Sequence, residues 1–517
     1  MVKPAAFASR AKPYIVPPTR HAPGFVPERA STRLSGYHGS VTCARRVLLV
    51  EPPFYRLYKD GYGLARYPLS LGYLAAALRT ATQSSVLVVN GDFHPDPEPF
   101  SAPYLTGEGF VRYCESLDDP KGPEWGRLGR TISRFVPDVI GITVRTPTLG
   151  SALAVARLAR EIRPEAVIVA GGPHATIIGD AMLDHPPIDV VAVGEAETTL
   201  VELVETLDRG GSPEDVPGLI FREGRRALRT RPRHPLEDLD GLPHPHRFAS
   251  EVLDEFDRHP VSAFGHILAT RGCPHACGFC SSPTLYGRKV RARSPDDVIF
   301  EVSSLQGMGV NHVHFEDDTF GIDEKHLCGL SSLLASKCRG ITWSCETHVN
   351  RISPESLVAM KQGGCTAIQL GIESGDDRVL SRIGKGFTYE RAHRASLAIK
   401  AAGLRLEAFF MVGCPEETVE SLAATRRAIE QSPADKIIYS IFTPYPGTPM
   451  FDSCRKLGLV GPHHDFSRHN HQSPENHFSP HIDYRQFREL AADIERLVSD
   501  KNGAARRREV LGCRTPQ

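Results

Sequence analysis

The sequence lacks the long apolar runs and the charge surplus that mark several classes of protein. It has no apolar run near the roughly 20 residues needed to span a bilayer, and its first 44 residues lack the apolar stretch of a secretory signal. Its 61 Lys and Arg residues are balanced by 61 Asp and Glu. Proteins that bind nucleic acid or anionic membranes usually carry an excess of basic residues, so neither is expected as a partner.

The cysteines do not form a disulfide framework. Three of the twelve, Cys273, Cys277 and Cys280, lie within eight residues, and the other nine are scattered. This distribution is typical of a reducing cytoplasm in which one cysteine cluster binds metal. We therefore expect a cytoplasmic protein.

The remaining composition is that of an ordinary soluble protein, with 41% apolar and 24% charged residues. A length of 517 residues predicts two to four domains at roughly 150 residues each. Residues 1–44 are rich in Pro and Arg, and Glu28 is their only acid. We expect them to form a disordered or loosely draped arm.

Residues 45–212 alternate between short apolar runs and helical patterns. Strands are predicted at 46–50, 86–89, 138–144, 166–170 and 189–193, with helices from Pro68, over 151–162 and over 195–207. Strand–helix units of this length predict an α/β domain with a doubly wound, Rossmann-like parallel sheet.

A second strand–helix series follows a change of pattern. Residues 213–258 are predicted to be a linker with a small hairpin. Residues 259–460 hold six further strands, predicted at 265–270, 311–316, 341–345, 365–372, 404–412 and 436–443, which favours a partial (β/α)6 barrel of the TIM type. Residues 461–517 are predicted to form a His-rich, solvated loop and an amphipathic helix over 483–498.

The stretch Gly272-Cys273-Pro-His-Ala-Cys277-Gly-Phe-Cys280 carries the strongest chemical signal. A structural zinc site normally has four ligands, often from two CxxC pairs, and no second pair lies nearby. Three thiolates suit an iron–sulfur cubane with one iron left open for a small ligand. A zinc site completed by His275 or a distant histidine, and a chance group of core cysteines, are the alternatives.

This motif resembles that of the radical S-adenosylmethionine superfamily, in which CxxxC, an aromatic residue and a further cysteine hold a 4Fe–4S cluster. The resemblance covers roughly residues 260–455. It implies that Phe279 packs beside the adenine of S-adenosylmethionine. It also implies cofactor contacts at the ends of successive strands, namely Glu316, Asp317 and Asp318, then Glu373 and Ser374, then Gly413.

The N-terminal domain has no GxGxxG after its first strand, so a dinucleotide is not expected. Its loops resemble those of the cobalamin-binding domain of one radical S-adenosylmethionine subfamily. The resemblance implies cobalamin contacts from Glu51, Pro52, Tyr67, Leu71, Gly72, Thr143, Gly171, Gly172, Gly194 and Glu195. Arg66, Tyr67 and Tyr62 are candidates to lie under the corrin.

The sequence around His94 indicates whether this chain supplies a histidine ligand to cobalt. Asp92-Phe-His94 begins the DxHxxG motif from which many cobalamin proteins supply a histidine, but Pro97 replaces the glycine. We therefore predict that no histidine of this chain binds cobalt.

The resemblance implies a cobalamin-dependent radical enzyme that methylates an unactivated carbon of a small-molecule substrate, natural products included. An external electron donor of the flavodoxin or ferredoxin type is implied as a partner. A cyclase, rearrangement or oxidation enzyme with the same cofactors is the alternative, and a cobalamin-binding sensor or scaffold is a third reading. Cys345 and Cys414 lie near predicted strand ends and are expected to be core filler rather than catalytic thiols.

Overall fold

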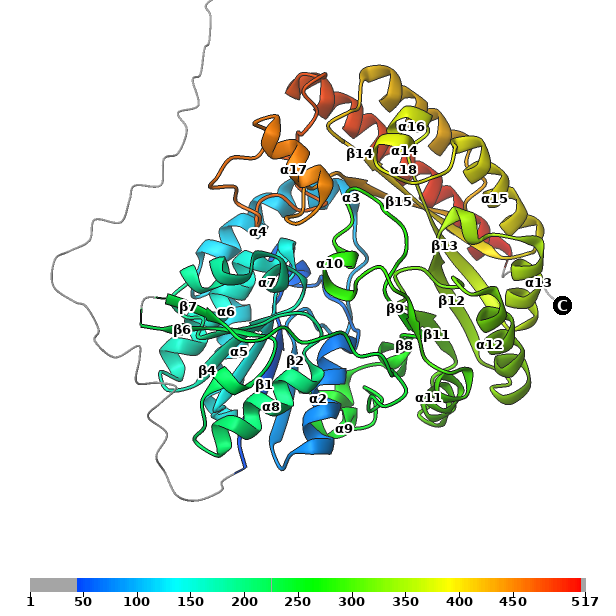
Figure 1. The fold of residues 1–517 in the computed structure, drawn as a ribbon. Helices are drawn as coiled ribbons and strands as arrows, with labels where there is room; N and C mark the ends of the chain where they lie inside the picture. The colour runs from blue at the N-terminus through cyan, green and yellow to red at the C-terminus, as the bar shows by residue number, and fades with distance from the viewer. Residues whose placement is uncertain (1–43, 225, 513–517) are drawn as a thin grey trace, which may run out of the picture.

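The computed structural model describes residues 44–224 and 226–512, which form two halves that face each other (Figure 1). Each half is built on a mostly or wholly parallel sheet with helices packed against it. The predicted arm, 1–44, lies outside the described residues except for its last one. In the described part of the chain, no helix is long and apolar enough to cross a bilayer.

The N-terminal half holds a seven-stranded sheet with the strand order β2-β1-β3-β4-β5-β6-β7. Its first five strands are parallel: β1 (Arg46–Glu51), β2 (Ser85–Asn90), β3 (Val139–Thr143), β4 (Val167–Gly171) and β5 (Val190–Ala192). The chain places β2 on one side of β1 and the later strands on the other. In doubly wound sheets, ligands bind at the carboxyl ends of the strands beside such a switch point, here between β1 and β3.

Helices cover both faces of this sheet. Leu71 of α2 shares a core with Leu49 of β1, whereas Ile132 of α5 shares the opposite core with Leu48. Successive residues of β1 thus face opposite layers, as the two-residue period of a strand requires. The helices of this half are α1 (Tyr55–Tyr58), α2 (Leu69–Ala81), α3 (Ala102–Thr106), α4 (Glu108–Asp118), α5 (Pro123–Phe135), α6 (Leu149–Ile162), α7 (Pro173–Ile178) and α8 (Glu197–Asp208), with the 3-10 helices η1 (Thr146–Thr148) and η2 (Gly179–Asp184).

The hairpin expected inside the linker belongs to the first sheet. β6 (Leu219–Glu223) pairs antiparallel with β5, and β7 (Arg226–Arg229) pairs with β6. The apolar residues at the start of β6 are buried because they extend the core of the sheet. The crossing to the second half therefore begins after β7, and it contains the short helices α9 (Ala249–Val252), η4 (Phe256–Arg258) and η5 (Val261–Phe264); η3 (Pro213–Asp215) precedes the hairpin.

The C-terminal half holds six parallel strands in the order β15-β14-β13-β12-β11-β8. They are β8 (His266–Ile267), β11 (His312–Phe315), β12 (Thr342–Thr347), β13 (Cys365–Glu373), β14 (Arg405–Val412) and β15 (Lys436–Ile441). β8 and β15 are its two edges, so this is the predicted partial barrel. The strand predicted at 265–270 divides in two, because β9 (Thr270–Arg271) leaves the sheet and pairs antiparallel with β10 (Arg291–Ala292).

Helices cover the outer face of this curved sheet (Figure 1). Trp343 and Cys345 of β12 point into the core beneath them, whereas Ser344 and Glu346 lie on the face turned inward. The helices of this half are α10 (Ser282–Tyr286), α11 (Pro295–Gly307), α12 (Glu324–Lys337), α13 (Pro354–Gln362), α14 (Asp377–Arg382), α15 (Tyr389–Ala401), α16 (Val419–Gln431) and α17 (Pro449–Lys456), with η6 (Val349–Arg351).

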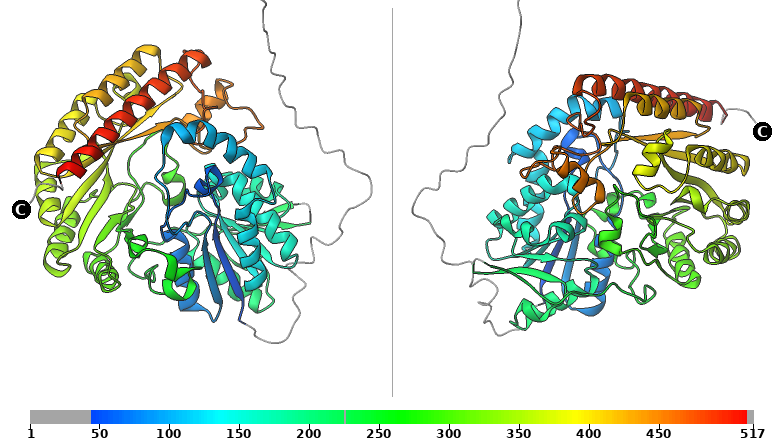
Figure 2. Two further views of the ribbon diagram at one scale, coloured as in Figure 1. Left: turned by 180° about the vertical axis from the view of Figure 1, so that it is seen from behind. Right: turned by 45° about the horizontal axis from the view of Figure 1, so that its top comes forward.

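The segment 461–483 does not form the solvated loop that its histidines suggested. Asn470, Ser473 and Asn476 are fully buried, and the hydroxyl of Tyr58 in the first half donates to Asn470 Oδ1 at 3.2 Å. The segment is thus packed between the two halves. Beyond it, α18 (Tyr484–Gly512) lies along β15 and α16, as the two further views show (Figure 2).

Candidate active site

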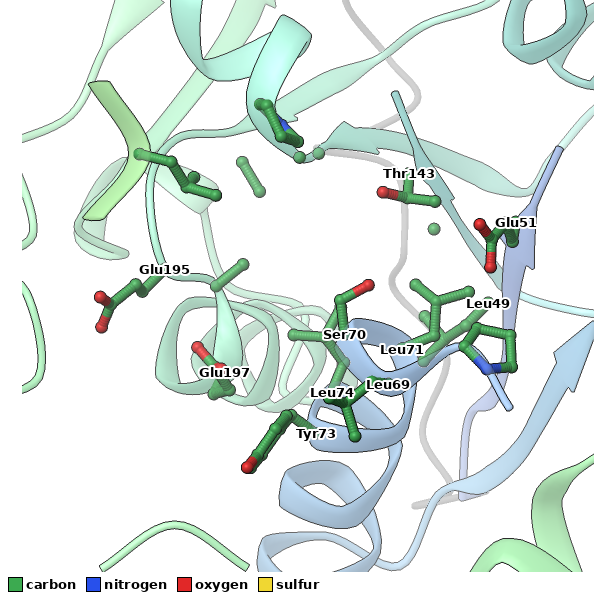
Figure 3. Close-up of a pocket in the computed structure, with 18 of the residues that line it drawn as sticks. Leu49, Glu51, Leu69, Ser70, Leu71, Tyr73, Leu74, Thr143, Glu195 and Glu197 are labelled. Carbon is green, nitrogen blue, oxygen red and sulfur yellow. The ribbon is translucent and has the colours of Figure 1, made fainter. Parts of the chain in front are cut away.

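A pocket lies between the two halves, lined by both sheets at the carboxyl ends of their strands. Its walls come from the ends of β1, β3, β4 and β5, the start of α2, the region of β8, β9 and β11, and α10. The space not filled by atoms is about 1510 Å³, including the part open to solvent. Figure 3 shows Glu51 and Thr143 on one side, and Glu195 and Glu197 on the other.

Glycines form the wall at the ends of β4 and β5. Gly171, Gly172 and Gly194 all line the pocket. Gly172 has a φ of 90°, and a Cβ there would lie 2.9 Å from Thr143 Oγ1. Gly194 has a φ of 78°, and a Cβ there would meet no atom within 4 Å. Backbone therefore forms this wall directly, and a large flat ligand can approach it closely.

Three residues predicted to contact cobalamin, Pro52, Tyr67 and Gly72, are not among those that line the pocket. The side chain of Tyr67 is fully buried, and its hydroxyl donates to the Pro245 carbonyl at 3.1 Å. Gly72 lies against that ring, since a Cβ there would be 2.5 Å from Tyr67 Cε1. Tyr67 and Gly72 thus brace the first turns of α2, from which Leu71 reaches the pocket.

Two carboxylates predicted at the cobalamin site do line the pocket, and each is paired. Glu51 Oε1 accepts from Arg145 Nη2 at 2.5 Å. Glu195 accepts from Arg291 Nη1 and from the Leu236 backbone N–H, both at 3.0 Å. The sequence contains no local signal for these partners, because each lies at least 41 residues away.

His94 does not line the pocket. Its Nδ1 accepts the backbone N–H of Asp96 at 3.2 Å. Asp92 is buried and accepts the backbone N–H groups of Phe54 and Arg56, at 2.7 and 3.2 Å; burial raises the pKa of Asp92 to about 6. The residues that resemble the start of a cobalt-ligand motif thus cap a turn here.

The three predicted metal ligands come from one loop that follows β9. Gly272 opens it with a φ of 96°, where a Cβ would lie 2.4 Å from the Lys289 carbonyl. Cys273 is buried, with its Sγ 3.3 Å from Thr319 Oγ1, while Cys277 and Cys280 are half-buried. Burial raises the pKa of Cys280 to about 11, so thiolate ligation releases its proton to solvent.

The donor set of this loop, three thiols and no fourth thiol from the same segment, suits a 4Fe–4S cubane with one open iron. A 4Fe–4S cube binds each thiolate to a different iron, so its ligands need not meet at a point. The loop therefore fits the cluster implied by the spacing of its cysteines.

Lys385 was not identified from the sequence and lies beside this loop. Its Nζ is 3.1 Å from Glu373 Oε1 and 5.8 Å from the centroid of the Phe279 ring. Burial would lower the pKa of Lys385, but the Glu373 carboxylate and the Cys277 thiol outweigh it and raise the pKa. A permanent positive charge thus lies next to the thiols.

The three acidic residues after β11 have different surroundings. Glu316 lines the pocket, where His266 Nδ1 lies 2.7 Å and Arg66 Nη1 3.2 Å from its Oε1. Burial would raise the pKa of Glu316, but His266 and Arg66 lower it to about 2. Asp318 also lines the pocket and accepts from Ser282.

Asp317 points away from the pocket. It accepts from the Ala269 N–H at 2.8 Å and the Thr270 hydroxyl at 2.6 Å, and burial raises its pKa to about 7. Asp317 therefore braces the strand that leads into the cysteine loop.

Ser374 and Gly413, two further predicted contacts, have structural partners. Ser374 is fully buried, with its hydroxyl 3.0 Å from that of Thr425. Gly413 has a φ of 92° and donates its N–H to Glu417. Both shape turns at strand ends.

Glu346 was also missed. It lies on the inward face of β12, and burial, together with Glu316 and Asp318, raises its pKa to about 7. The one sequence signal for Glu346 is its position in β12, where it alternates with apolar residues and therefore faces inward.

Comparison with known proteins matches both halves of the chain. Residues 63–204 match the model of the B12 binding domain, and residues 267–429 match that of the Radical SAM superfamily. The chain is 32% identical over 409 residues to an uncharacterized methyltransferase, PH0819, of Pyrococcus horikoshii, covering 79% of this chain and 82% of the relative. The chain belongs to the cobalamin-binding radical SAM enzymes. Its cofactors are a 4Fe–4S cluster, S-adenosylmethionine and cobalamin.

Other similar proteins in this family carry out different reactions. Cytidylyl-2-hydroxyethylphosphonate methyltransferase of Streptomyces wedmorensis is 27% identical, with 87% of this chain and 89% of the relative covered. Anaerobic magnesium-protoporphyrin IX monomethyl ester cyclase of Rubrivivax gelatinosus is 26% identical, with 75% and 70% covered. The structure of the methyltransferase TsrM of Kitasatospora setae, with cobalamin and a [4Fe–4S] cluster bound, superposes with a TM-score of 0.65 at 18% identity, covering 88% and 89%. This last likeness supports the fold.

Proposed function

We propose that this enzyme transfers a methyl group to an unactivated carbon of a small-molecule substrate. The observation that carries the proposal is the shared pocket, in which Glu51 and Thr143 of the cobalamin domain and Glu316 and Asp318 of the barrel line one space. Methyl transfer requires the substrate carbon to be close to both cofactors, and a common pocket supplies that closeness. Relatives that are methyltransferases by name, among them that of Streptomyces wedmorensis, support this reaction.

In this proposal, the residues of the chain bind the cofactors and orient them toward the substrate. When bound, the cluster and S-adenosylmethionine supply a 5′-deoxyadenosyl radical, and cobalamin supplies the methyl group. Cys273, Cys277 and Cys280 hold the cluster, and Lys385 places a positive charge beside their thiolates. The glycine-lined wall at β4 and β5 receives cobalamin. The packed segment 461–483 closes the space between the halves and so excludes water from part of their interface.

We also propose an external one-electron donor of the flavodoxin or ferredoxin type. Splitting S-adenosylmethionine into a radical and methionine consumes one electron. The chain's matched domains account for the cluster and cobalamin but not for a flavin or a second cluster that would store electrons. The donor is therefore sought among separate proteins.

The experiment is anaerobic reconstitution with S-adenosylmethionine that carries a deuterated methyl group, together with a panel of candidate metabolites. The expected product gains one methyl group that contains deuterium, and 5′-deoxyadenosine is formed alongside it. Cys277→Ala is the control, because it should yield neither product. A substrate that is consumed together with S-adenosylmethionine while its product carries no label would contradict methyl transfer.

A cyclase, rearrangement or oxidation reaction with the same cofactors is the second candidate, and the similarity to the Rubrivivax cyclase favours it. The same experiment separates it from methylation, because its product would not gain the deuterated methyl group. A sensor or scaffold would show cobalamin binding with no cleavage of S-adenosylmethionine.

A further inference from the structure

The turn after α14 packs directly on the cysteine loop. Gly384 in this turn has a φ of 74°, and a Cβ there would lie 2.6 Å from the Ala276 carbonyl oxygen and 3.7 Å from Cys277 Cα. One residue earlier, the Ile383 carbonyl accepts the Gly278 N–H at 2.8 Å. Only a glycine allows the backbone to approach the loop this closely. The residue that follows Gly384 is therefore fixed beside the loop.

That residue, Lys385, turns its side chain inward. The side chain is 6% exposed, and its Nζ lies 3.1 Å from Glu373 Oε1. The same ammonium lies 5.8 Å from the ring centroid of Phe279, which adjoins Cys280, and 5.6 Å from that of Phe387. A buried ammonium is costly unless such partners offset its lost hydration. The positive charge is therefore held at one place near the thiols.

The carboxylate partner of this lysine is also fixed in place. Glu373 ends β13 with a φ of 71°, a left-handed backbone that residues other than glycine rarely adopt. Gly371, two residues earlier, leaves space for the pair, since a Cβ there would lie 2.8 Å from Glu373 Oε1 and 3.0 Å from Lys385 Nζ. Strained backbone of this kind persists where the surrounding structure holds it, and it is concentrated at functional sites. One charge of each sign is thus fixed beside the cysteine loop.

The two charges act on the thiols with opposite sign. Burial raises the pKa of Cys277, the Lys385 charge lowers it, and the Glu373 charge raises it. A cluster that accepts an electron becomes more negative, so a nearby cation stabilises its reduced form and a nearby carboxylate stabilises its oxidised form. Both effects are larger in a buried site than in water, because the effective dielectric constant is lower. The net charge around a cluster is among the features that set its reduction potential.

We propose that Lys385 and Glu373 tune the reduction potential of the 4Fe–4S cluster in opposite directions, Lys385 upward and Glu373 downward. One electron from the external donor converts the oxidised cluster to its reduced form, and the two side chains set how readily this happens. Both residues act through the cluster and need no contact with the substrate. The inference rests on the cluster and not on the methyl transfer proposed above, so a reaction without a methylated product would leave it standing.

The test is a redox titration of the cluster-loaded protein with a chemical reductant, followed by electron paramagnetic resonance. It is carried out without S-adenosylmethionine, so that contacts of Glu373 with this cofactor do not enter. We expect Lys385→Met to shift the one-electron equilibrium about tenfold or more toward the oxidised cluster, which corresponds to a midpoint about 59 mV lower. Lys385→Arg keeps the charge, so its equilibrium should stay within about threefold of wild type.

Glu373→Gln provides the opposite change. It removes the carboxylate and should shift the equilibrium toward the reduced cluster, which raises the midpoint. The double variant of Lys385→Met with Glu373→Gln removes one charge of each sign, so its midpoint should return toward that of wild type. A purely structural role for the pair would not produce shifts of opposite sign.

Lys400→Met is the matched control, because Lys400 also pairs with a carboxylate, that of Asp435, with 2.6 Å between Nζ and Oδ2. Asp435 directly precedes β15, so this pair lies at the amino ends of the strands, away from the cysteine loop. The midpoint of this variant should equal that of wild type. A Lys385→Met protein with full iron and sulfide content whose midpoint equals or exceeds that of wild type would overturn the proposal. If that variant assembles no cluster, Glu373→Gln decides alone, and an unchanged or lower midpoint there would overturn it.

Discussion

Cys273, Cys277 and Cys280 project from one short loop, so each thiol can be removed with little disturbance to other elements. We predict that Cys277→Ala abolishes cluster assembly and the formation of 5′-deoxyadenosine, because two thiolates cannot hold the cube with one open iron. Iron and sulfide content and chromatography of the products measure both. Cys328→Ala is the control, since Cys328 is half-buried on α12, outside the pocket. A Cys277→Ala protein that still yields 5′-deoxyadenosine would refute the assignment.

His94 is the other single residue with a clear test. We predict that cob(II)alamin bound to the protein shows no nitrogen hyperfine splitting from a lower ligand in electron paramagnetic resonance. The reason is that His94 lies outside the pocket and its Nδ1 accepts a backbone N–H. If splitting is present in wild type and lost in His94→Ala, this prediction is wrong.

Neither Arg271 nor Lys385 was identified as a site residue from the sequence. Arg271 is next to the motif, but its partner Glu197 is 74 residues away. Lys385 follows Glu373 by 12 residues and turns back to it only because α14 reverses the chain. Ion pairs between distant segments leave no pattern in local sequence, so these roles required coordinates.

Among the strands and helices, β12 and the turn after β14 each place one cysteine, Cys345 and Cys414, in a packed core. Cys345 on β12 is fully buried in the main core, and Cys414 after β14 is 1% exposed in a smaller one. Burial raises the pKa of both thiols well above the usual value, so they remain neutral and are poor nucleophiles.

We therefore predict that Cys345→Ala and Cys414→Ala retain methyl transfer while each lowers stability by about 1 kcal/mol. Mass analysis of the product and denaturant unfolding measure the two effects. A folded, cluster-loaded variant that cleaves S-adenosylmethionine but makes no methylated product would show that the thiol takes part in the chemistry.

Glu417, in the turn after β14, makes the free energy of unfolding of the protein depend on pH. Burial raises the pKa of Glu417 to about 8, from 4.5. Between these values the folded protein keeps a proton that the unfolded chain has released. The stabilisation from this group is thus complete at low pH and falls by at most about 1.4 kcal/mol per pH unit until the pH passes the folded pKa.

Glu417→Gln cannot ionise, so we predict that its thermal midpoint falls less than that of wild type between about pH 6 and pH 8. Scanning calorimetry at several pH values gives the comparison. Glu416→Gln, one residue away and only half-buried, should retain the wild-type slope. Identical slopes for wild type and Glu417→Gln would contradict the assignment.

At the scale of the whole molecule, segment 461–483 links the two halves. Asn470 Oδ1 accepts both the Tyr58 hydroxyl, at 3.2 Å, and the Gln472 N–H, at 2.9 Å. We predict that Asn470→Ala costs about 1–3 kcal/mol, because it leaves the buried Tyr58 hydroxyl without its partner.

Thermal unfolding of Asn470→Ala, Tyr58→Phe and the double variant measures the coupling between the two side chains. His463→Ala, an exposed position in the same segment, is the control and should change little. Strictly additive effects would show that this hydrogen bond does not join the halves.

Elements whose signals lie within a few residues of one another could be predicted from the amino-acid sequence. Short apolar runs predicted the five parallel strands of the first sheet and the strands of the second, except that the strand expected at 265–270 divides in two. The CxxxCxxC spacing, also local, predicts the three cluster cysteines. Three features required the packed structure: β6 and β7 extend the first sheet, Asn470, Ser473 and Asn476 are buried within segment 461–483, and Glu195 and Glu197 meet Arg271 and Arg291. Each of these depends on which surfaces come together when the two halves pack. That packing sets the contacts between residues distant in the chain, so the local sequence around each residue contains no signal for them.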